Sequence, residues 1–344
     1  MSAKDRKTVF LLGAGASKGS MYQLPCMAGF FEEEIEEEAL ERFLQWFYKD
    51  TPRDKYNLEE VLSYLELART RLQQWGFSDR SKFQPQALFE ATLRYVRKRL
   101  ELPAEPAVCN YHHDLCKRLR ARDTIITLNY DLIVDKALFA LEGTSGFEGE
   151  RYARDGSRTI TLKGLVDAQS FGGGPPITLT TYERQSGFYL KLHGSLNWLH
   201  CPNADCQNHQ RIFSLKFEGD NYSQREGEPC RMCGAVIQPF LVAPMPSKQL
   251  QEKGRLRILW RLALQELADA DRIVVVGLSF AASDFELRWL AKQAMELRKP
   301  THNLELHVVD PFPNIQERVQ VVFGIKAAYI CEALNSYLGS SQSA

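Results

Sequence analysis

The chain has 344 residues, 44% of them hydrophobic and 25% charged, which is typical of a globular protein with a sizeable buried core. Lys+Arg and Asp+Glu each number 43, and this zero net charge excludes a bulk binder of nucleic-acid phosphates, which would carry a basic excess. No apolar run is long enough to cross a bilayer and no cleavable signal precedes the first strand-like run, so we expect a cytoplasmic protein without a membrane partner.

The first expected element is a buried strand at residues 8–12, which stops at the segment Gly-Ala-Gly-Ala-Ser, residues 13–17. A continuous apolar run followed by a glycine turn is typical of a central parallel strand. Such a turn brings backbone N–H groups close to a bound pyrophosphate when a helix follows it. A purely structural turn is an equally good interpretation of this segment alone.

Residues 28–120 show helical spacing over most of their length and are expected to form a helical insertion. Apolar side chains recur at helical intervals, for example at Leu58, Val61, Leu62 and Leu65. The acidic run at 32–38 lies inside this region, and we interpret it as a solvated helix face.

Four further strand-like runs follow, at residues 124–128, 189–192, 272–276 and 306–309. An amphipathic helix with Leu256, Leu259, Leu262 and Leu267 on one side is expected before the third of these runs, and another helix after it. Strand, helix, strand with apolar runs is the pattern of βαβ units on a buried parallel sheet. The sequence therefore predicts an α/β fold, a doubly wound Rossmann-like sheet within one domain of residues 1–344.

Polar or glycine residues follow each expected strand directly. They are Gly13, Gly15, Ser17, Asn129, Asp131, His193, Gly277, Ser279 and Asp310. In open α/β sheets, ligands bind in the crevice outside the carboxyl ends of the strands. We therefore expect these segments to face one crevice.

The glycine segment departs from the usual dinucleotide fingerprint. Lys18 stands where a third glycine would be, and no acidic residue ends a second strand about 20 residues further on. This disfavours an ordinary hydride-transferring dehydrogenase.

Four segments carry a family resemblance: residues 13–17 (GAGAS), 127–131 (TLNYD), 192–195 (LHGS) and 277–279 (GLS). Together, and in this order, they resemble the signatures of the sirtuin family over about residues 8–311. The TLNYD form and the helical insertion look more like the divergent bacterial branch, whose members hydrolyse NAD in antiphage defence, often beside a HerA-type ATPase. The resemblance implies NAD as substrate and cleavage of its nicotinamide–ribose bond. Because such activity needs restraint, we expect regulation by a homo-oligomer or a HerA-type partner.

The resemblance also implies roles for individual residues. Asn129 would position a water molecule or the ribose, and His193 would be the catalytic base. An amide offers both a donor and an acceptor, and an imidazole can take a proton near neutral pH. The residues implied to bind the cofactor are Gly13, Ala14, Gly15, Ala16 and Ser17 at the pyrophosphate, Asp131 near the nicotinamide ribose, Gly277 and Ser279 toward the phosphate and adenosine, and Asp310 at the adenosine ribose.

Several alternatives stay open. Asn129 or Asp131 could cap the following helix instead of contacting a ligand, and Asp284 is a candidate N-cap of a later helix. An NAD-dependent protein deacylase is one alternative, and it would need a groove in which an extended peptide pairs with a strand edge. Residues 244–247 lie where such a groove would be, but their two prolines make a poor edge for strand pairing. A non-catalytic nucleotide-sensing subunit is the third possibility. His112, His113 and His307 are expected to be structural.

Four of the eight cysteines form two close pairs with the spacing of a zinc ribbon, and they define a small module at residues 198–240. They are Cys201, Cys206, Cys230 and Cys233. A closed site of four thiolates leaves no position for water, so this zinc would be structural. His209 could replace one cysteine, and a metal-free loop is the alternative. The scattered Cys26, Cys109, Cys116 and Cys331 are expected to be small core residues.

Overall fold

The computed structural model describes residues 6–77, 82–103, 108–120, 122–141, 187–203, 205–207, 212–214, 227–242, 254–281, 284–299, 303–330 and 334–340. His209, Cys331 and the proline-containing segment at 244–247 lie outside these ranges, as does most of the stretch between the second and third expected strands.

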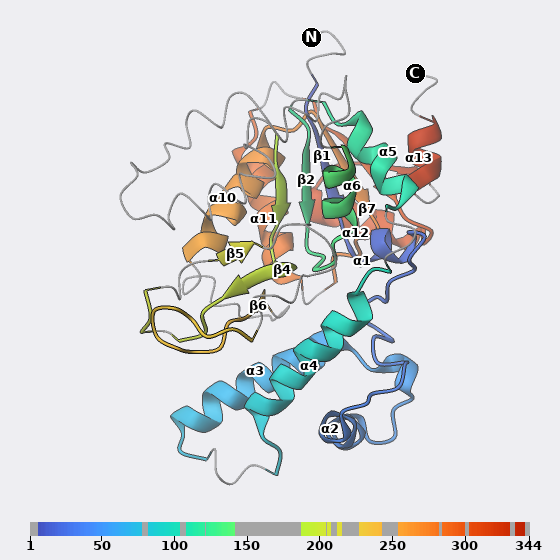
Figure 1. The fold of residues 1–344 in the computed structure, drawn as a ribbon. Helices are drawn as coiled ribbons and strands as arrows, with labels where there is room; N and C mark the ends of the chain where they lie inside the picture. Colours follow the sequence, from blue (N-terminus) through green and yellow to red (C-terminus); the bar gives the residue numbers. More distant parts are fainter. Residues whose placement is uncertain are drawn as a thin grey trace.

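A sheet of six parallel strands forms the centre of the molecule, in the order β3-β2-β1-β7-β8-β9 (Figure 1). The strands are β1 Thr8–Leu12, β2 Thr124–Thr127, β3 Tyr189–Lys191, β7 Arg272–Val276, β8 Glu305–Val309 and β9 Ala328–Ile330. The central strands are apolar and buried because both faces of a parallel sheet are covered. The doubly wound α/β fold predicted from the sequence is confirmed.

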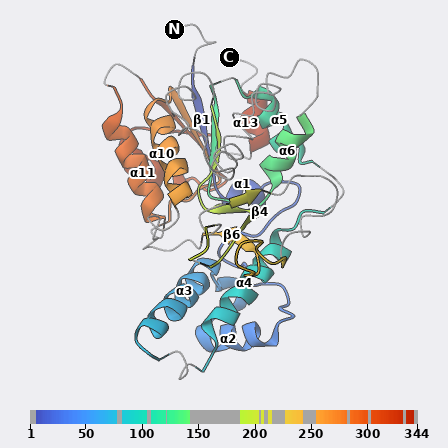
Figure 2. The same ribbon diagram turned by 60° about the vertical axis from the view of Figure 1, so that its left-hand side comes forward.

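Helices cover both faces of this sheet (Figure 2). On one face lie α10 Gly254–Ala268 and α11 Phe285–Leu297, with α12 Asn314–Phe323 packed against α11. On the other face lie α5 Asn110–Arg118, α6 Ile133–Leu141 and α13 Leu334–Ser340. The leucines expected to form the inner side of α10 are buried. None of the helices in the described ranges is both long and apolar enough to span a bilayer.

The order of the strands reverses between β1 and β7. From β1 the chain continues to β2 and β3 on one side, whereas β7, β8 and β9 extend the sheet on the other side. The short helix α1, Ala14–Lys18, begins at this point, directly after β1. In open α/β sheets, such a reversal opens a crevice at the carboxyl ends of the strands, where ligands bind.

A separate group of helices lies beyond the carboxyl ends of the strands (Figure 1). It consists of α2 Glu38–Tyr48, the 3-10 turn Arg53–Lys55, α3 Leu58–Gln74 and α4 Pro85–Leu100. These elements share an apolar core rich in aromatic rings, including Phe30, Phe31, Phe43 and Tyr95. Helix α5 lies within the range 28–120 but contributes Leu115 and Cys116 to the core of the sheet.

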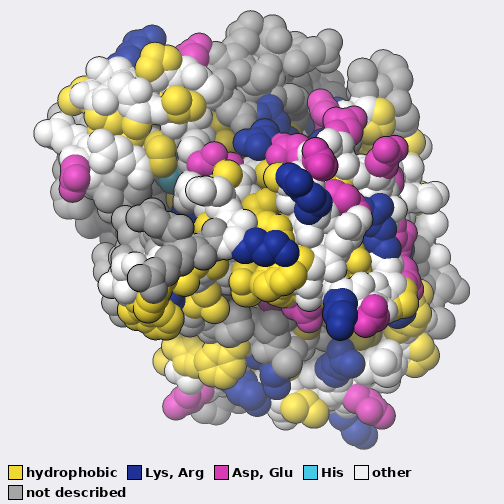
Figure 3. All heavy atoms as spheres, turned by 90° about the horizontal axis from the view of Figure 1, so that it is seen from below, with side chains coloured by type: hydrophobic (Ala, Val, Ile, Leu, Met, Phe, Trp, Pro, Cys, Tyr) yellow, Lys and Arg dark blue, Asp and Glu magenta, His cyan; other side chains and the backbone are white. Residues whose placement is uncertain are grey.

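The interpretation of the acidic run as a helix face is wrong for residues 32–37. These residues precede α2 and form no helix, and three of their carboxylates form ion pairs with basic side chains of α4. The ion pairs are Glu33–Arg99, Glu36–Lys98 and Glu37–Arg94. On one helix, like charges four residues apart repel one another, whereas here the glutamates are paired with the basic side chains of a different helix. Seen from the side of the helical group, the surface mixes charges of both signs with hydrophobic patches (Figure 3).

A second, antiparallel sheet has the order β5-β4-β6, and the four paired cysteines lie in the segments that follow β4 and precede β6. Its strands are β4 Gly194–His200, β5 Ile212–Ser214 and β6 Gln238–Leu241. Strand β4 begins three residues after the end of β3, so the chain passes from one sheet to the other through Leu192 and His193.

Candidate functional site

The turns after β1 and β7 are packed directly against each other at the reversal. The N–H of Gly13 donates to Val276 O at 3.0 Å, and that of Gly15 donates to Gly277 O at 2.8 Å. Gly277 has φ +55°, and a Cβ there would lie 2.2 Å from the nitrogen of Ala16. The glycines are therefore required for the close approach of two backbones. The N–H groups of Gly13, Gly15 and Gly277 already donate hydrogen bonds to backbone carbonyls of the protein. The contribution of these glycines to a pyrophosphate site is therefore the shape of the turn.

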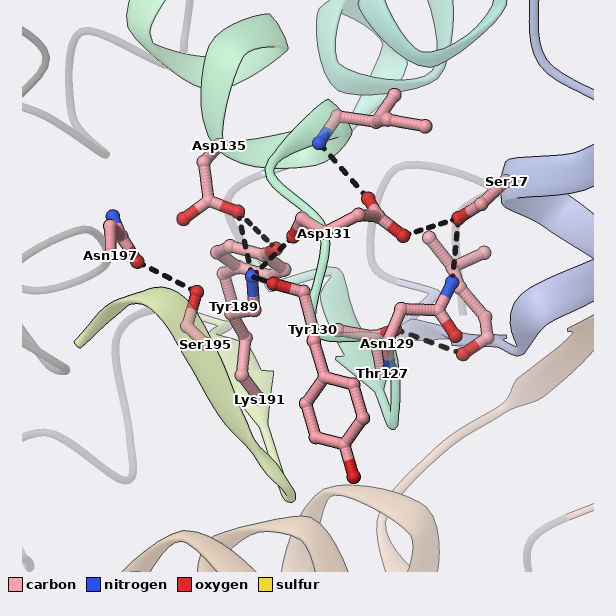
Figure 4. A network of polar contacts seen from close by, with 12 residues as sticks. Ser17, Thr127, Asn129, Tyr130, Asp131, Asp135, Tyr189, Lys191, Ser195 and Asn197 are labelled. Atoms are coloured by element: carbon pink, nitrogen blue, oxygen red, sulfur yellow. Dashed lines mark hydrogen bonds and ion pairs between the residues drawn. The ribbon is translucent and has the colours of Figure 1, made fainter. Parts of the chain in front are cut away.

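Asn129, directly beyond β2, reaches across to this turn (Figure 4). Its amide Nδ2 donates to Gly13 O at 2.9 Å and to Ser17 Oγ at 2.8 Å. Its backbone N–H donates to Thr127 Oγ1 at 3.0 Å. Asn129 is half-buried, and no residue of the described chain donates a hydrogen bond to its Oδ1. The amide is thus fixed through its nitrogen, and its oxygen is left as an acceptor.

Asp131 is buried, and both of its carboxylate oxygens are used inside the protein (Figure 4). Oδ2 accepts the hydroxyl proton of Ser17 at 2.6 Å, and Oδ1 accepts the N–H of Ile133, the first residue of α6, at 3.0 Å. Asp131 therefore caps the start of α6, which was the alternative to its contact with a ligand. Asp131 also holds the Ser17 hydroxyl toward Asn129, while its contact with a ligand stays a prediction.

Lys191, at the end of β3, was not anticipated from the sequence. Its side chain is fully buried, and Nζ donates to Asp131 O at 2.5 Å and to Asp135 Oδ2 at 3.0 Å. The hydroxyl of Tyr189 donates to the same Asp135 oxygen at 2.8 Å. The sequence does carry one sign of this role, which is a lysine within an apolar strand. Such a lysine is expected to be buried, and a buried ammonium group needs hydrogen-bond acceptors nearby. The ion pair fixes the loop that carries Asn129 and Asp131.

His193 lies between the two sheets and is buried. Its ring centroid is 6.4 Å from that of Tyr130 and 6.2 Å from that of Trp260, and its backbone O accepts the N–H of Val242 at 2.8 Å. The following Gly194 has φ +87°, and a Cβ there would lie 2.2 Å from the Phe240 carbonyl oxygen. Gly194 is therefore required by the sharp turn of the chain between the two sheets.

Two backbone hydrogen bonds place the His193 segment beside the Asn129 segment. Leu192 N–H donates to Thr127 O at 2.9 Å, and Leu196 N–H donates to Tyr130 O at 3.0 Å. Residues 192–196 and 127–131 consequently run side by side beyond the carboxyl ends of β3 and β2. The structure brings both predicted catalytic segments to one edge of the sheet.

The remaining predicted residues lie on the side of β7 and β8. Gly277 N–H donates to Val309 O at 3.0 Å, which ties the turn after β7 to the end of β8. Ser279 is exposed, whereas Asp310 is buried and accepts the N–H of Phe312 on Oδ1 at 2.9 Å. Burial raises the pKa of the Asp310 carboxyl, and the Phe312 hydrogen bond opposes this effect. Asp284 is at the expected N-cap position of α11, but its carboxylate accepts the N–H of Ala281.

His112 of α5 lies close enough to Asp131 for the carboxylate charge to act on it. Burial lowers the pKa of His112 to about 4, and the negative charge of Asp131 opposes this effect. Its Nδ1 is 3.3 Å from Cys109 Sγ. His307, in contrast, lies within β8, and its Nδ1 is 3.1 Å from the hydroxyl of Tyr337 on α13. Both histidines were expected to be structural; His112 is buried, and His307 is half-buried.

The four paired cysteines come together as predicted. Their sulfur atoms all lie within 4.8 Å of one another, with 3.5 Å between Cys201 and Cys233 and 3.8 Å between Cys206 and Cys230. Zinc–sulfur bonds of about 2.3 Å in a tetrahedron give sulfur–sulfur distances of ~3.8 Å. The arrangement therefore fits one zinc ion with all four positions taken by thiolates. Of the scattered cysteines, Cys109 and Cys116 are buried, and Cys26 is half-buried.

Comparisons with known proteins give structural likeness only. No family model matches the sequence, and no curated protein matches it. A solved Sir2 homolog–NAD complex is 15% identical, with 97% of this chain and 87% of that chain covered and a TM-score of 0.47. A structure on the mechanism and regulation of Sir2 enzymes is 18% identical (98% and 90% covered, TM-score 0.43), and one on sirtuin substrate affinity is 14% identical (98% and 93%, TM-score 0.46). Because these TM-scores are below 0.5, the fold assignment rests on the strand order of the sheet.

Proposed function

We propose that the chain binds NAD in the crevice beyond the carboxyl ends of β1 and β7 and hydrolyses its nicotinamide–ribose bond. The observation that carries this proposal is the convergence of three segments at the reversal of strand order. The glycine segment 13–17, Asn129 and His193 follow three neighbouring strands and are tied together by hydrogen bonds between their backbones and side chains. Crevices of this kind are where doubly wound folds bind nucleotides.

The chemistry required is the replacement of nicotinamide at C1′ of the ribose by water. The C–N bond breaks with its electron pair going to nicotinamide, positive charge develops on the sugar, and the water oxygen bonds to C1′ as it loses a proton. The open Oδ1 of Asn129 can accept a hydrogen bond from the water or from a ribose hydroxyl. His193 is the group proposed to take the proton. The products are nicotinamide, ADP-ribose and a proton.

The surroundings of the site support a fixed arrangement of these groups. Asn129 Nδ2 donates to both Gly13 O and Ser17 Oγ, so the amide cannot rotate without breaking two hydrogen bonds. Ser17 is held in turn by the hydrogen bond that it donates to Asp131. The rings of Tyr130 and Trp260 flank His193 and limit its movement. A preorganised amide and imidazole contribute more to catalysis than mobile ones, because their orientation is fixed before the substrate binds. The zinc ion would hold the second sheet and has no part in the reaction.

The wider biological role rests on the sequence resemblance alone. We propose that the protein acts in the cytoplasm as an NAD-depleting effector of antiphage defence. A homo-oligomer, or a complex with a HerA-type ATPase, would restrain this activity until it is triggered.

Purified protein incubated with NAD, with nicotinamide release followed by liquid chromatography, tests the proposal. We expect steady release by the wild type and a loss of at least ~100-fold in Asn129→Ala and His193→Ala, the range for removal of a positioned catalytic group. Asn110→Ala and His113→Ala, both on α5, are matched controls that should keep the wild-type rate.

Three outcomes would contradict hydrolysis. Release that requires an acylated peptide would indicate a deacylase. Tight binding of ADP-ribose without turnover would indicate a nucleotide sensor. Equal losses in the catalytic and control variants would show that the substitutions act through folding.

A further inference from the structure

Helix α3 of the helical group carries apolar side chains on two faces, and only one of these faces is covered. Val61 and Leu65 are buried in the core of the helical group, whereas Tyr64 and Leu67 are 38% and 46% exposed. Trp46 of α2 is 47% exposed and continues this outer surface, because its ring centroid is 6.1 Å from that of Tyr64. The outer face of α3 therefore presents an apolar surface to water.

The exposed area is large enough to form the centre of a protein contact. Trp75, directly after α3, is 63% exposed. At about 200 Å² for a complete aromatic side chain, the exposed fractions of Trp46, Tyr64 and Trp75 leave roughly 300 Å² of aromatic surface per chain. Aromatic side chains are enriched at protein interfaces. A stable complex buries about 800 Å² per partner, so polar residues around the aromatic ones must supply the rest.

Two exposed side chains of opposite charge lie on this same face of α3. Positions 60, 64, 67 and 71 are three or four residues apart and therefore share one face of the helix. Glu60, near the start of α3, accepts a hydrogen bond from the hydroxyl of Tyr48, and Arg71, near its end, donates one to Gln74. Neither Glu60 nor Arg71 forms an ion pair within the part of the chain that the structure describes. Each charge is thus available to an opposite charge from outside.

A second copy of this face fits the first when the two α3 helices lie antiparallel. A two-fold axis midway between Tyr64 and Leu67 brings each of them opposite the other residue of the second copy. Glu60 and Arg71 are equally far from this midpoint, so the same axis brings Glu60 of each copy opposite Arg71 of the other. A parallel arrangement would instead place Glu60 opposite Glu60 and Arg71 opposite Arg71, and like charges would repel. The charges therefore favour a symmetric antiparallel contact.

We propose that two copies of this chain associate through α3, with the helices antiparallel, Trp46, Tyr64 and Leu67 at the centre, and two ion pairs between Glu60 and Arg71. The inference rests on the proposed function in so far as it names the surface that forms the homo-oligomer, and it does not depend on the cleavage of NAD. Because the aromatic surface is small, we expect a dissociation constant on the order of micromolar.

Sedimentation velocity of the full chain over about 1–100 µM, a range around the expected dissociation constant, tests the inference. Glu60→Arg and Arg71→Glu each place like charges opposite one another, so each variant alone should dimerise at least ~10-fold more weakly than the wild type. An equimolar mixture of the two variants should associate again, because one then presents only positive and the other only negative charge at these positions. Glu317→Arg and Arg318→Glu, exposed reversals on α12, are matched controls that should leave association unchanged.

A further variant tests the apolar centre without changing any charge. Leu67→Ser should also weaken dimerisation at least ~10-fold, because Leu67 lies at the middle of the contact. A wild type that stays monomeric at about 100 µM, well above the expected dissociation constant, would overturn the inference. So would α3 variants that associate as the controls do, or a mixture that stays monomeric. Nicotinamide release by the wild type is measured separately, so failure of this inference leaves the proposed cleavage of NAD standing.

Discussion

His112 is expected to make the stability of this protein depend on pH. The side chain is buried on α5, in contact with Cys109 and within reach of the charge of Asp131. Burial lowers its pKa from 6.5 in the unfolded chain to about 4 in the folded protein. The unfolded state therefore binds the proton more readily. The stabilisation is fully present above the unfolded pKa and is lost as the pH falls toward the folded pKa.

The size of the effect follows from the same values. One pKa unit corresponds to about 1.4 kcal/mol, so the change from 6.5 to about 4 corresponds to about 3 kcal/mol of unfolding free energy. Most of it, about 2 kcal/mol, should already be lost at about pH 5. Such a loss is a large fraction of the stability of an ordinary domain.

The assay is urea unfolding of the wild type and His112→Gln at about pH 7.5 and about pH 5. The variant is less stable at neutral pH, but the difference between the two proteins should shrink by about 2 kcal/mol at the lower pH. Taking this difference removes the contributions of other titrating groups, such as Glu266 and Asp310, whose pKa values are raised by burial. His113→Gln on the same helix is the control, and its difference from the wild type should change much less because that ring is half-buried. A difference between wild type and His112→Gln that is the same at both pH values would refute the reasoning, as would a His112 ring that titrates near 6.5 by NMR.

Two further predictions concern the framework of the site. Lys191→Met should destabilise the protein by about 3–5 kcal/mol, because it leaves the buried Asp135 carboxylate without its cation. Adding Asp135→Asn should recover part of the loss. If the single change has no effect on stability in denaturant titrations, the ion pair has no structural role. Native mass spectrometry should find about one zinc ion per chain, and Cys233→Ser, which changes the exposed member of the cluster, should weaken zinc binding and lower the Tm. Retention of zinc in that variant at wild-type affinity would mean that the cluster binds the metal differently.

The strands and their polar ends could be predicted from the sequence because each is a local pattern. A buried parallel strand is an uninterrupted apolar run, and β1, β2, β3, β7 and β8 were each found to within one or two residues. The zinc ligands could likewise be predicted, because the two cysteines of each pair are close in the sequence and a short loop is enough to bring their thiolates together. The acidic segment before α2 was misread, because its partners on α4 are more than 50 residues away in the sequence.

The sequence by itself determined the α/β class, the cysteine cluster and the set of residues at the strand ends. Only the tertiary structure decided how those residues are used. It assigned both oxygens of Asp131 to Ser17 and Ile133, left one oxygen of Asp310 without a bond from the described chain, and made Lys191 the anchor of the Asn129 loop. The reason is physical: the type of a side chain fixes how many hydrogen bonds it can form. Which of them are already satisfied depends on groups brought close by folding.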